Sequence, residues 1–271
     1  MANGKFIKIQ PSDILKHFAQ RGDLRAMAYV HNSDLGKYVW VFDTNVFIDD
    51  VDYPKCEKIV MAGNFLVSMD VIDELTRGVP VPGVSQWQRA RKLADYIVKH
   101  HPDKIFQKPN AQLVQELQKL SVIMSKGYVQ KTVFDNLTSI YALFKSSKNQ
   151  QDTLDKFIYA INDKMYQTLK NNFKSRAKGL VQESKINAIE NYFIENMKAA
   201  LKAIFHSLMN YASLDIEACK KYLMRHFFRP INADVNIAAS YIEHRKPHHH
   251  LGSNDKDVVE LIILHEHRAL A

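Results

Sequence analysis

Two short apolar runs, each followed by a carboxylate, organise the first part of this chain. Residues Tyr38 to Phe42 are all apolar or aromatic and lead into Asp43, and the run Phe65 to Met69 leads into Asp70 in the same way. Runs of this kind are typical of strands buried on both faces, as in a parallel sheet. A shorter run, Lys104 to Gln107, is a third candidate strand.

Helical spacing of apolar residues separates these runs. It predicts helices from Pro54 to Met61, from Val71 to Arg77 and from Trp87 to His100. Strands that alternate with helices are typical of an α/β fold with a mostly parallel sheet. Residues 1–37, with helical spacing after Pro11, are read as a helical N-terminal lead-in.

Helical spacing alone continues from Asn110 to Arg225, where Pro and Gly are almost absent. We expect about four or five helices in this stretch. The chain then divides into an α/β domain of residues 38–109 and 228–271 and a large all-helical insertion of residues 110–227. Helical spacing returns at the end of the chain, from Val258 to His267.

Composition indicates the class of protein and the compartment to expect. Hydrophobic residues make up 46% of the 271 positions, which is ample for a packed core. No apolar run is long enough to cross a bilayer, and the polar start, Met1 to Lys5, has no signal-peptide core. We therefore expect a cytoplasmic protein without a membrane partner. Cys56 and Cys219 follow no pairing pattern, so we expect free thiols and no zinc site built on Cys.

Positive charge is concentrated in the predicted insertion. Between Lys104 and His226 there are 19 Lys and Arg against 10 Asp and Glu, whereas the whole chain has a net charge of +8. A basic segment beside a carboxylate-rich site suits a phosphodiester substrate, because release of counterions from the nucleic acid contributes affinity. The alternative is a helical surface made soluble by Lys. The densest basic run consists of Lys170, Lys174, Arg176 and Lys178.

The first candidate for chemistry is Asp43, at the end of the first predicted strand. In open α/β sheets the functional groups gather at the carboxyl ends of strands. Thr44 and Asn45 follow, and either side chain can cap the next segment or fix the rotamer of Asp43. The alternative is an ordinary strand-to-helix turn. The acids of the loop that follows, Asp49, Asp50 and Asp52, are read as solvated residues and caps.

The residues from Val41 to Ile48, Val-Phe-Asp-Thr-Asn-Val-Phe-Ile, resemble the opening motif of the PIN-domain nuclease superfamily. The resemblance implies a three-layer sandwich around a central, mostly parallel sheet, with an acidic metal site that begins at Asp43. It also implies that Glu74, which precedes Leu75 in the helix after the second strand, is the second carboxylate. Phosphohydrolases of the haloacid-dehalogenase type also open on a strand-end Asp, but they have a second Asp where this chain has Asn45.

The last acids can be aligned with this family in two registers. In the first, Asp234, which is followed by Ile-Ala-Ala, resembles the third carboxylate, and Ser253-Asn-Asp-Lys-Asp257 resembles the closing element that contains Asp255. The 21 positions between Asp234 and Asp255 suit a helix, a turn and a strand. However, Pro247 to Gly252 is a poor strand by composition. In the second register Asp255 is the third carboxylate at the head of the last helix, and the last strand and fourth acid are absent.

The resemblance implies a divalent-metal-dependent nuclease, with single-stranded RNA favoured over DNA. Because carboxylates suit hard, oxygen-loving cations, we expect Mg²⁺ or Mn²⁺. The expected catalytic residues are Asp43, Glu74, Asp234 and Asp255. The expected metal ligands are Asp43, Glu74, Asp255 and Asp257, and the expected orienting groups are Thr44 and Asn45.

Two other classes of function compete with this one. A PIN-like protein without cleavage activity would bind nucleic acid or act as a scaffold, and the poor last strand favours that class. A phosphohydrolase of small molecules is disfavoured by the basic helical segment. In either case the insertion is a candidate surface for a protein partner or a second copy of the chain.

Two groups of residues complete the expectations for the site. By the resemblance, the helix that ends at His100 lies near the substrate, so its cations are candidate phosphate contacts together with the basic run of the insertion. Those helix cations are Arg89, Arg91 and Lys92. Six histidines near the end of the chain are read as a solvated surface rather than as metal ligands: His244, His248, His249, His250, His265 and His267.

Overall fold

The computed structural model describes residues 36–77, 85–106, 108–146, 149, 151–153, 155–156, 159, 166–210, 215–228, 231–246, 249–253 and 255–269. The chain forms two compact units, which are described separately. One unit comprises Met1–Lys119 with Ile231–Glu266, and the other comprises Leu120–Pro230 with His267–Ala271. The predicted lead-in lies outside the described residues, apart from its last two positions.

The first unit contains a sheet of four parallel strands in the order β3-β2-β1-β4. The strands are β1 (Val39–Phe42), β2 (Phe65–Ser68), β3 (Ile105–Phe106) and β4 (His249–Gly252). The chain moves outward from β1 through β2 to β3 and then returns to the other side of β1. The direction of winding therefore reverses at β1, and ligands of open α/β sheets bind at the carboxyl ends of the strands beside such a reversal.

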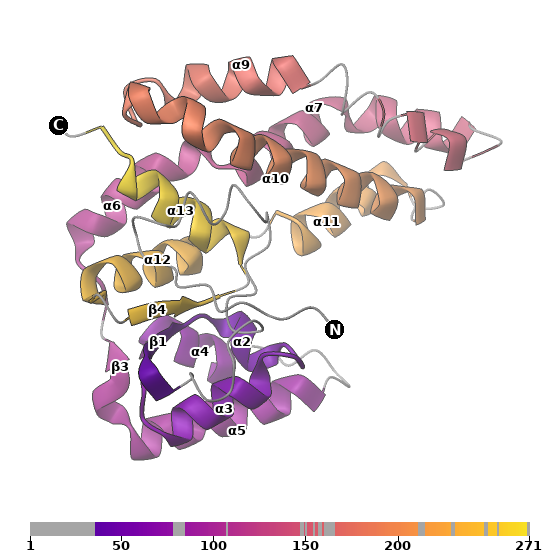
Figure 1. The fold of residues 1–271 in the computed structure, drawn as a ribbon. Coiled ribbons are helices and arrows are strands. Elements are labelled where there is room, and N and C mark those ends of the chain that lie inside the picture. The colour runs from indigo at the N-terminus through magenta and orange to yellow at the C-terminus, as the bar shows by residue number, and fades with distance from the viewer. Residues whose placement is uncertain are drawn as a thin grey trace, which may run out of the picture. The chain divides into compact units, whose positions relative to one another are not determined.

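Helices fill the connections of this unit as the spacing predicts. They are α2 (Thr44–Ile48), α3 (Tyr53–Met61), α4 (Met69–Arg77), α5 (Ser85–His100), α6 (Ala111–Leu120), α12 (Asn232–His244) and α13 (Lys256–Glu266). Figure 1 shows α12 and α13 on one side of β1 and β4, with α3 and α5 on the other. α5 packs against both α2 and α4, and α4 also packs against α12. The α/β fold with a parallel sheet is thus confirmed.

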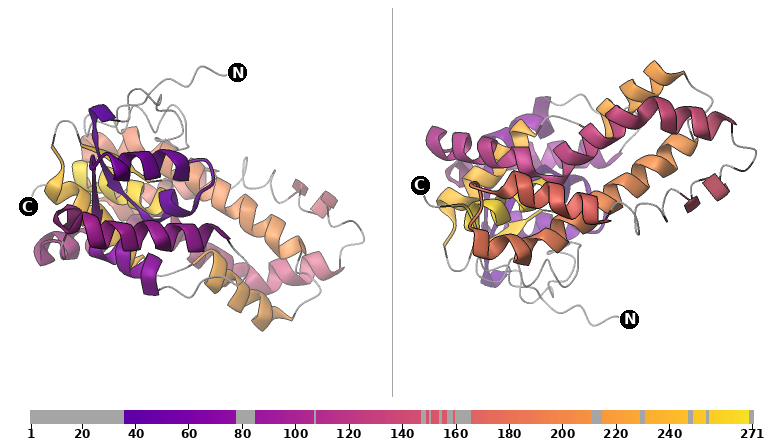
Figure 2. Two further views of the ribbon diagram at one scale, coloured as in Figure 1. Left: turned by 90° about the horizontal axis from the view of Figure 1, so that it is seen from below. Right: turned by 90° about the horizontal axis from the view of Figure 1, so that it is seen from above.

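The second unit is helical where it is described, as predicted for the insertion. Its helices are α7 (Ser125–Ser146), α9 (Tyr166–Ala177), α10 (Glu183–Asn210) and α11 (Ile216–His226). α10 packs along both α7 and α9 (Figure 2), and its buried side chains include Phe193, Met197 and Leu201. None of the helices that the structure describes is long and apolar enough to span a membrane.

Two features differ from the sequence prediction. The stretch judged a poor strand contains β4, which pairs along its whole length with β1 and is buried at all four residues. Pairing with a central strand therefore overrides the weak strand propensity of His249, His250 and Gly252. The boundary of the insertion also moves, because α6 belongs largely to the α/β unit and residues 267–271 belong to the helical one.

Candidate active site

The site is built around Asp43, which follows β1 at the point where the winding of the sheet reverses. Its backbone N–H donates to the carbonyl of Gly252, the last residue of β4, at 2.9 Å. Its side chain is the N-cap of α2 and is only 3% exposed. Asp43 therefore combines the two roles weighed from the sequence: it caps a helix and also places a carboxylate at the carboxyl edge of the sheet.

Three neighbouring groups hold the Asp43 carboxylate. The N–H of Thr44 donates to Oδ1 at 2.6 Å, as expected of an N-cap. The amide of Asn45 donates to Oδ2 at 3.2 Å, and the hydroxyl of Ser253 donates to the same oxygen at 2.6 Å. The rotamer of Asp43 is thus set both by the start of α2 and by the residue that follows β4. The orienting role expected of Thr44 and Asn45 matches these contacts.

Glu74 reaches this site through Thr44. The buried hydroxyl of Thr44 donates to Oε2 of Glu74 at 2.8 Å, across 30 positions of sequence. Glu74 itself lies on the exposed face of α4. The carboxylate of Glu74 therefore lies at the solvent side of the site, whereas that of Asp43 lies at its base.

Asp255 is brought to the site by the turn that follows β4. The Ser253 hydroxyl oxygen accepts the N–H of Asp255 at 2.9 Å while its proton is donated to Asp43. Asp255 in turn accepts the N–H of Asp257 through Oδ1 at 2.7 Å, and so caps the start of α13. Asp257 is thus linked to the site through its backbone.

The charges of the neighbouring carboxylates shift the pKa of Asp43. Burial, the largest cause, and the charge of Asp255 raise the pKa of Asp43 from 3.8 to about 7, and Glu74 adds a smaller upward shift. The hydrogen bonds from Ser253 and Thr44 act in the opposite direction. The neighbouring charges that act on Asp43 are thus both negative, which is the arrangement that a bound cation would relieve.

The fourth predicted acid, Asp234, lies in the first turn of α12 and is half-buried. Its helix packs against α4, which carries Glu74, and against α13, which follows Asp255. The helix and strand that the first register requires between Asp234 and Asp255 are both present as α12 and β4. The second register is wrong about the last strand. The place of Asp234 in the acid group remains a prediction.

The acid group is not a closed metal cage. Among the described residues, no three His, Cys, Asp or Glu side chains lie close enough together to hold a metal ion as they stand. One oxygen of Glu74 accepts from Thr44, and one oxygen of Asp255 accepts from a backbone N–H. Asp43, Glu74 and Asp255 are therefore near one another, and each is held by its own hydrogen bond within the protein.

The cations predicted on α5 have different surroundings. Arg89 donates to Asp50 at 2.8 Å and to the carbonyl of Ile48 at 3.3 Å, and Arg91 donates to the carbonyl of Leu75 at 3.4 Å. Lys92 is exposed. Two of the three candidate phosphate contacts are therefore bonded to the protein itself.

The basic run of the insertion is also partly engaged. Lys170 and Lys174 lie 2.9 and 3.4 Å from the carboxylate of Glu190, which is 3% exposed. Arg176 donates to the carbonyl of Val122. Lys178 is exposed at the end of α9. These contacts hold α9 against its neighbours. Part of the run predicted to bind phosphates therefore stabilises the packing of α9 instead.

Three of the six histidines that were predicted to lie on a solvated surface are buried, whereas His244 and His267 are half-buried. His249 and His250 lie in β4 and are 7% and 1% exposed, and the ring of His250 meets that of Tyr38 at a centroid distance of 4.3 Å. His265 is buried as well, and His248 lies outside the described residues. The three buried imidazoles are therefore part of the core of the α/β unit.

Sequence reasoning missed one residue of the site and misjudged the exposure of one acid in the loop after α2. Ser253 was predicted only as part of the closing motif and was given no role, although it links Asp43 to Asp255. Asp52, read as a solvated acid, is 1% exposed at the start of α3. A signal for Ser253 was available, because a small hydroxyl residue directly after a strand, two positions before an acid, can form a turn hydrogen bond.

In comparisons with known proteins, no protein-family model, curated protein or solved structure matches this chain.

Proposed function

We propose that this chain is a PIN-like nuclease that hydrolyses phosphodiester bonds with the help of Mg²⁺ or Mn²⁺. The observation that supports the proposal is the group of Asp43, Glu74 and Asp255. These acids come from three separate segments and gather at the reversal point of a parallel sheet. Both of the other carboxylates raise the pKa of the buried one. Acidic groups that raise the pKa of a buried neighbour are a common feature of functional sites, and carboxylate oxygens are the ligands that Mg²⁺ and Mn²⁺ prefer.

The donor atoms suit the proposed cation. The oxygens around Asp43 come from carboxylates, an amide-bearing side chain and hydroxyl groups, and such hard ligands favour Mg²⁺ or Mn²⁺ over softer metals. We propose Asp43 and Asp255 as direct ligands, with Glu74 as a ligand or as a base acting through water and Asp257 as a further ligand. When bound, the ion would activate water and stabilise negative charge on the phosphate.

The other residues of the site have positioning roles in this proposal. Ser253 and Asn45 hold Oδ2 of Asp43, and Thr44 holds both Oδ1 of Asp43, through its N–H, and Glu74, through its hydroxyl. Because each of these contacts restricts the rotation of a carboxylate, the acids are pre-oriented before substrate binds. Asp234 is proposed as the remaining acid.

RNA is the proposed substrate because of the family resemblance and the basic character of the insertion, with single strands favoured. A large PIN-like sandwich with a basic helical insertion would bring phosphate-binding cations and the acid group into one chain. The insertion is also the proposed surface for a protein partner or a second copy.

The test is cleavage of end-labelled RNA and DNA, single-stranded and duplex, with Mg²⁺ or Mn²⁺. We expect wild type to cleave single-stranded RNA, and Asp43→Asn and Asp255→Asn to bind it without cleavage. Asp95→Asn is the matched control, because Asp95 is an exposed acid of α5. Binding without cleavage by wild type would instead favour the scaffold function. Full activity in Asp43→Asn would show that the site lies elsewhere.

A further inference from the structure

Two arginines of α5 hold the ends of the helices that carry the acids. Nη2 of Arg89 donates at 3.3 Å to the carbonyl of Ile48, the last residue of α2. Nε of Arg91 donates at 3.4 Å to the carbonyl of Leu75, in the last turn of α4. The final carbonyls of a helix have no partner within it, and cations near them are favourable. α5 therefore supplies a side-chain donor to both helices.

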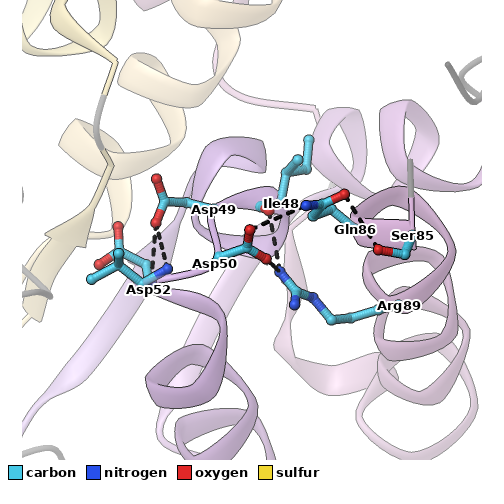
Figure 3. A network of polar contacts seen from close by, with 8 residues as sticks. Ile48, Asp49, Asp50, Asp52, Ser85, Gln86 and Arg89 are labelled. Carbon is cyan, nitrogen blue, oxygen red and sulfur yellow. Dashed lines mark hydrogen bonds and ion pairs between the residues drawn. The ribbon is translucent and has the colours of Figure 1, made fainter. Parts of the chain in front are cut away.

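Arg89 is itself held firmly (Figure 3). Its Nη2 lies 2.8 Å from Oδ1 of Asp50, and the amide of Gln86 donates to the other oxygen of that carboxylate at 3.1 Å. The guanidinium also lies 4.1 Å from the ring centre of Tyr53. The hydrogen bonds from Gln86 and Arg89 lower the pKa of Asp50. Arg89 thus joins the end of α2, the following loop and the start of α3 to α5.

The opposite end of α2 is the centre of the acid group. The helix has five residues, with Asp43 as its N-cap and Thr44, which donates to Glu74, as its first residue. A helix of fewer than two turns has few internal hydrogen bonds of its own, so its position depends on what holds its two ends. A shift at Ile48 is therefore transmitted to Thr44 and to the carboxylate of Asp43.

We propose that Arg89, supported by Arg91, is a positioning residue of the acid site and not a contact for the phosphates of the substrate. By fixing the C-terminal end of α2, Arg89 sets the orientation of Asp43 and the Thr44 to Glu74 hydrogen bond. Arg91 does the same for the end of α4. The inference rests on the proposed metal-dependent function, and it concerns residues that the sequence alone indicated as phosphate contacts.

The two roles of Arg89 predict different responses to Arg89→Lys. A phosphate contact needs mainly a positive charge, which Lys keeps. Positioning needs Nη2, at the far end of the guanidinium, to reach both Asp50 and the Ile48 carbonyl while the planar group lies over the Tyr53 ring. The side chain of Lys is shorter and its ammonium is not planar, so Lys does not reproduce this reach and this ring contact together. Lys99 is the matched control, because it lies on the same helix, is exposed and has no role in the proposed site.

The experiment compares wild type, Arg89→Ala, Arg89→Lys and Lys99→Ala. Mn²⁺ affinity is measured from the electron paramagnetic resonance signal of free Mn²⁺, and kcat and KM are measured on single-stranded RNA. We expect both Arg89 variants to lose about 10- to 100-fold in Mn²⁺ affinity and kcat, the usual effect of removing a group that orients ligands, with KM nearly unchanged. Lys99→Ala should keep wild-type Mn²⁺ affinity and kcat. Wild-type values in Arg89→Lys, with a raised and salt-dependent KM in Arg89→Ala, would overturn the proposal.

A readout without metal or substrate separates this inference from the proposed function. Exchange of the amide protons of Val46 and Asp49, which bond back to Asp43 and Asn45 respectively, reports the order of α2. We expect faster exchange in both Arg89 variants, with circular dichroism confirming that they are folded, and no change in Lys99→Ala. Unchanged exchange in the Arg89 variants would overturn the positioning role. Failure of wild type to bind Mn²⁺ or cleave RNA would overturn the proposed function instead.

Discussion

The hydroxyl of Ser253 lies 2.6 Å from Oδ2 of Asp43, although the two residues are 210 positions apart in the sequence. The same oxygen accepts the N–H of Asp255, so one small side chain joins the end of β1 to the turn after β4. β1 and β4 end level with each other, because Phe42 pairs with Gly252. The strand register therefore brings the first and last acids of the site together, and Ser253 fixes their relative position.

Ser253→Ala should weaken the site. The change removes a donor from a buried carboxylate and an acceptor from the N–H of Asp255, so we expect a loss of roughly 1.5–3 kcal/mol in the free energy of unfolding near pH 8. We also expect about 10- to 100-fold lower Mn²⁺ affinity. Urea unfolding and metal titration measure the two effects.

The control for this change is Ser240→Ala. Ser240 is also buried, in α12, but its hydroxyl has no hydrogen-bond partner within the described part of the chain. Removing it should be neutral or slightly stabilising. Equal losses of stability in the two variants would contradict the role given to Ser253.

The free energy of unfolding should depend on pH through the ionisation of Asp43. Folding raises the pKa of Asp43 from 3.8 to about 7 when a chelator removes any metal ion. Asp43 is therefore protonated in both the folded and the unfolded chain below about pH 4, and ionised in both above about pH 7. Between these limits the unfolded chain releases its proton first. Asp43 therefore destabilises the fold increasingly as pH rises, by roughly 4 kcal/mol in total.

Asp43→Asn should remove this effect. The stability of the variant relative to wild type should rise between about pH 4 and pH 8, as measured by urea unfolding at a series of pH values. Asp95→Asn, at an exposed position, should show no such trend. A difference between Asp43→Asn and wild type that stays constant with pH would show that the pKa of Asp43 is not raised.

The sequence predicts the first half of this site better than the second. The apolar run before Asp43 forms the buried strand that was predicted, and the helix predicted after the second strand is α4, which carries Glu74. β4 could not be predicted, because two histidines and a glycine have little preference for strands and the segment becomes one only by pairing with β1.

The role of Arg89 could not be predicted for a similar reason. The spacing of α5 shows that Arg89 is on the partly polar side of a helix, but the sequence does not show that the end of α2 and Asp50 lie opposite it. Charged residues that bond to the backbone of another element look the same in sequence as solvated ones. Long-range contacts of this kind depend on tertiary packing, which local patterns do not encode.

Divalent cations should stabilise the fold through the acid group. Near pH 8, Mg²⁺ or Mn²⁺ at about 100 times its dissociation constant should add about 2.7 kcal/mol to the free energy of unfolding of wild type, because it binds only the folded chain. Asp43→Asn and Asp255→Asn should lose most of this gain. Thermal unfolding with and without the ion measures it. An equal gain from KCl at the same ionic strength, or in the two variants, would contradict a specific site.

The last prediction concerns the lysines around Glu190 in the helical unit. The carboxylate of Glu190 is almost fully buried between Lys170 and Lys174. Replacing both lysines with Ala leaves a buried charge without these partners, so we expect a loss of roughly 3–5 kcal/mol in the free energy of unfolding of this unit. Adding Glu190→Gln should recover much of that loss, because the buried group is then neutral. Urea unfolding of the three chains measures the coupling.

Lys178→Ala is the matched control, because Lys178 belongs to the same basic run but is exposed. It should leave stability unchanged and lower RNA affinity, with a weaker dependence of the dissociation constant on salt, as measured by fluorescence anisotropy. Replacing Lys170 and Lys174 with Ala should have the opposite pattern of effects. In the triple variant, where Glu190→Gln restores folding, RNA affinity should stay close to that of wild type. If this triple variant instead loses at least as much RNA affinity as Lys178→Ala does, then Lys170 and Lys174 bind phosphates in addition to holding α9.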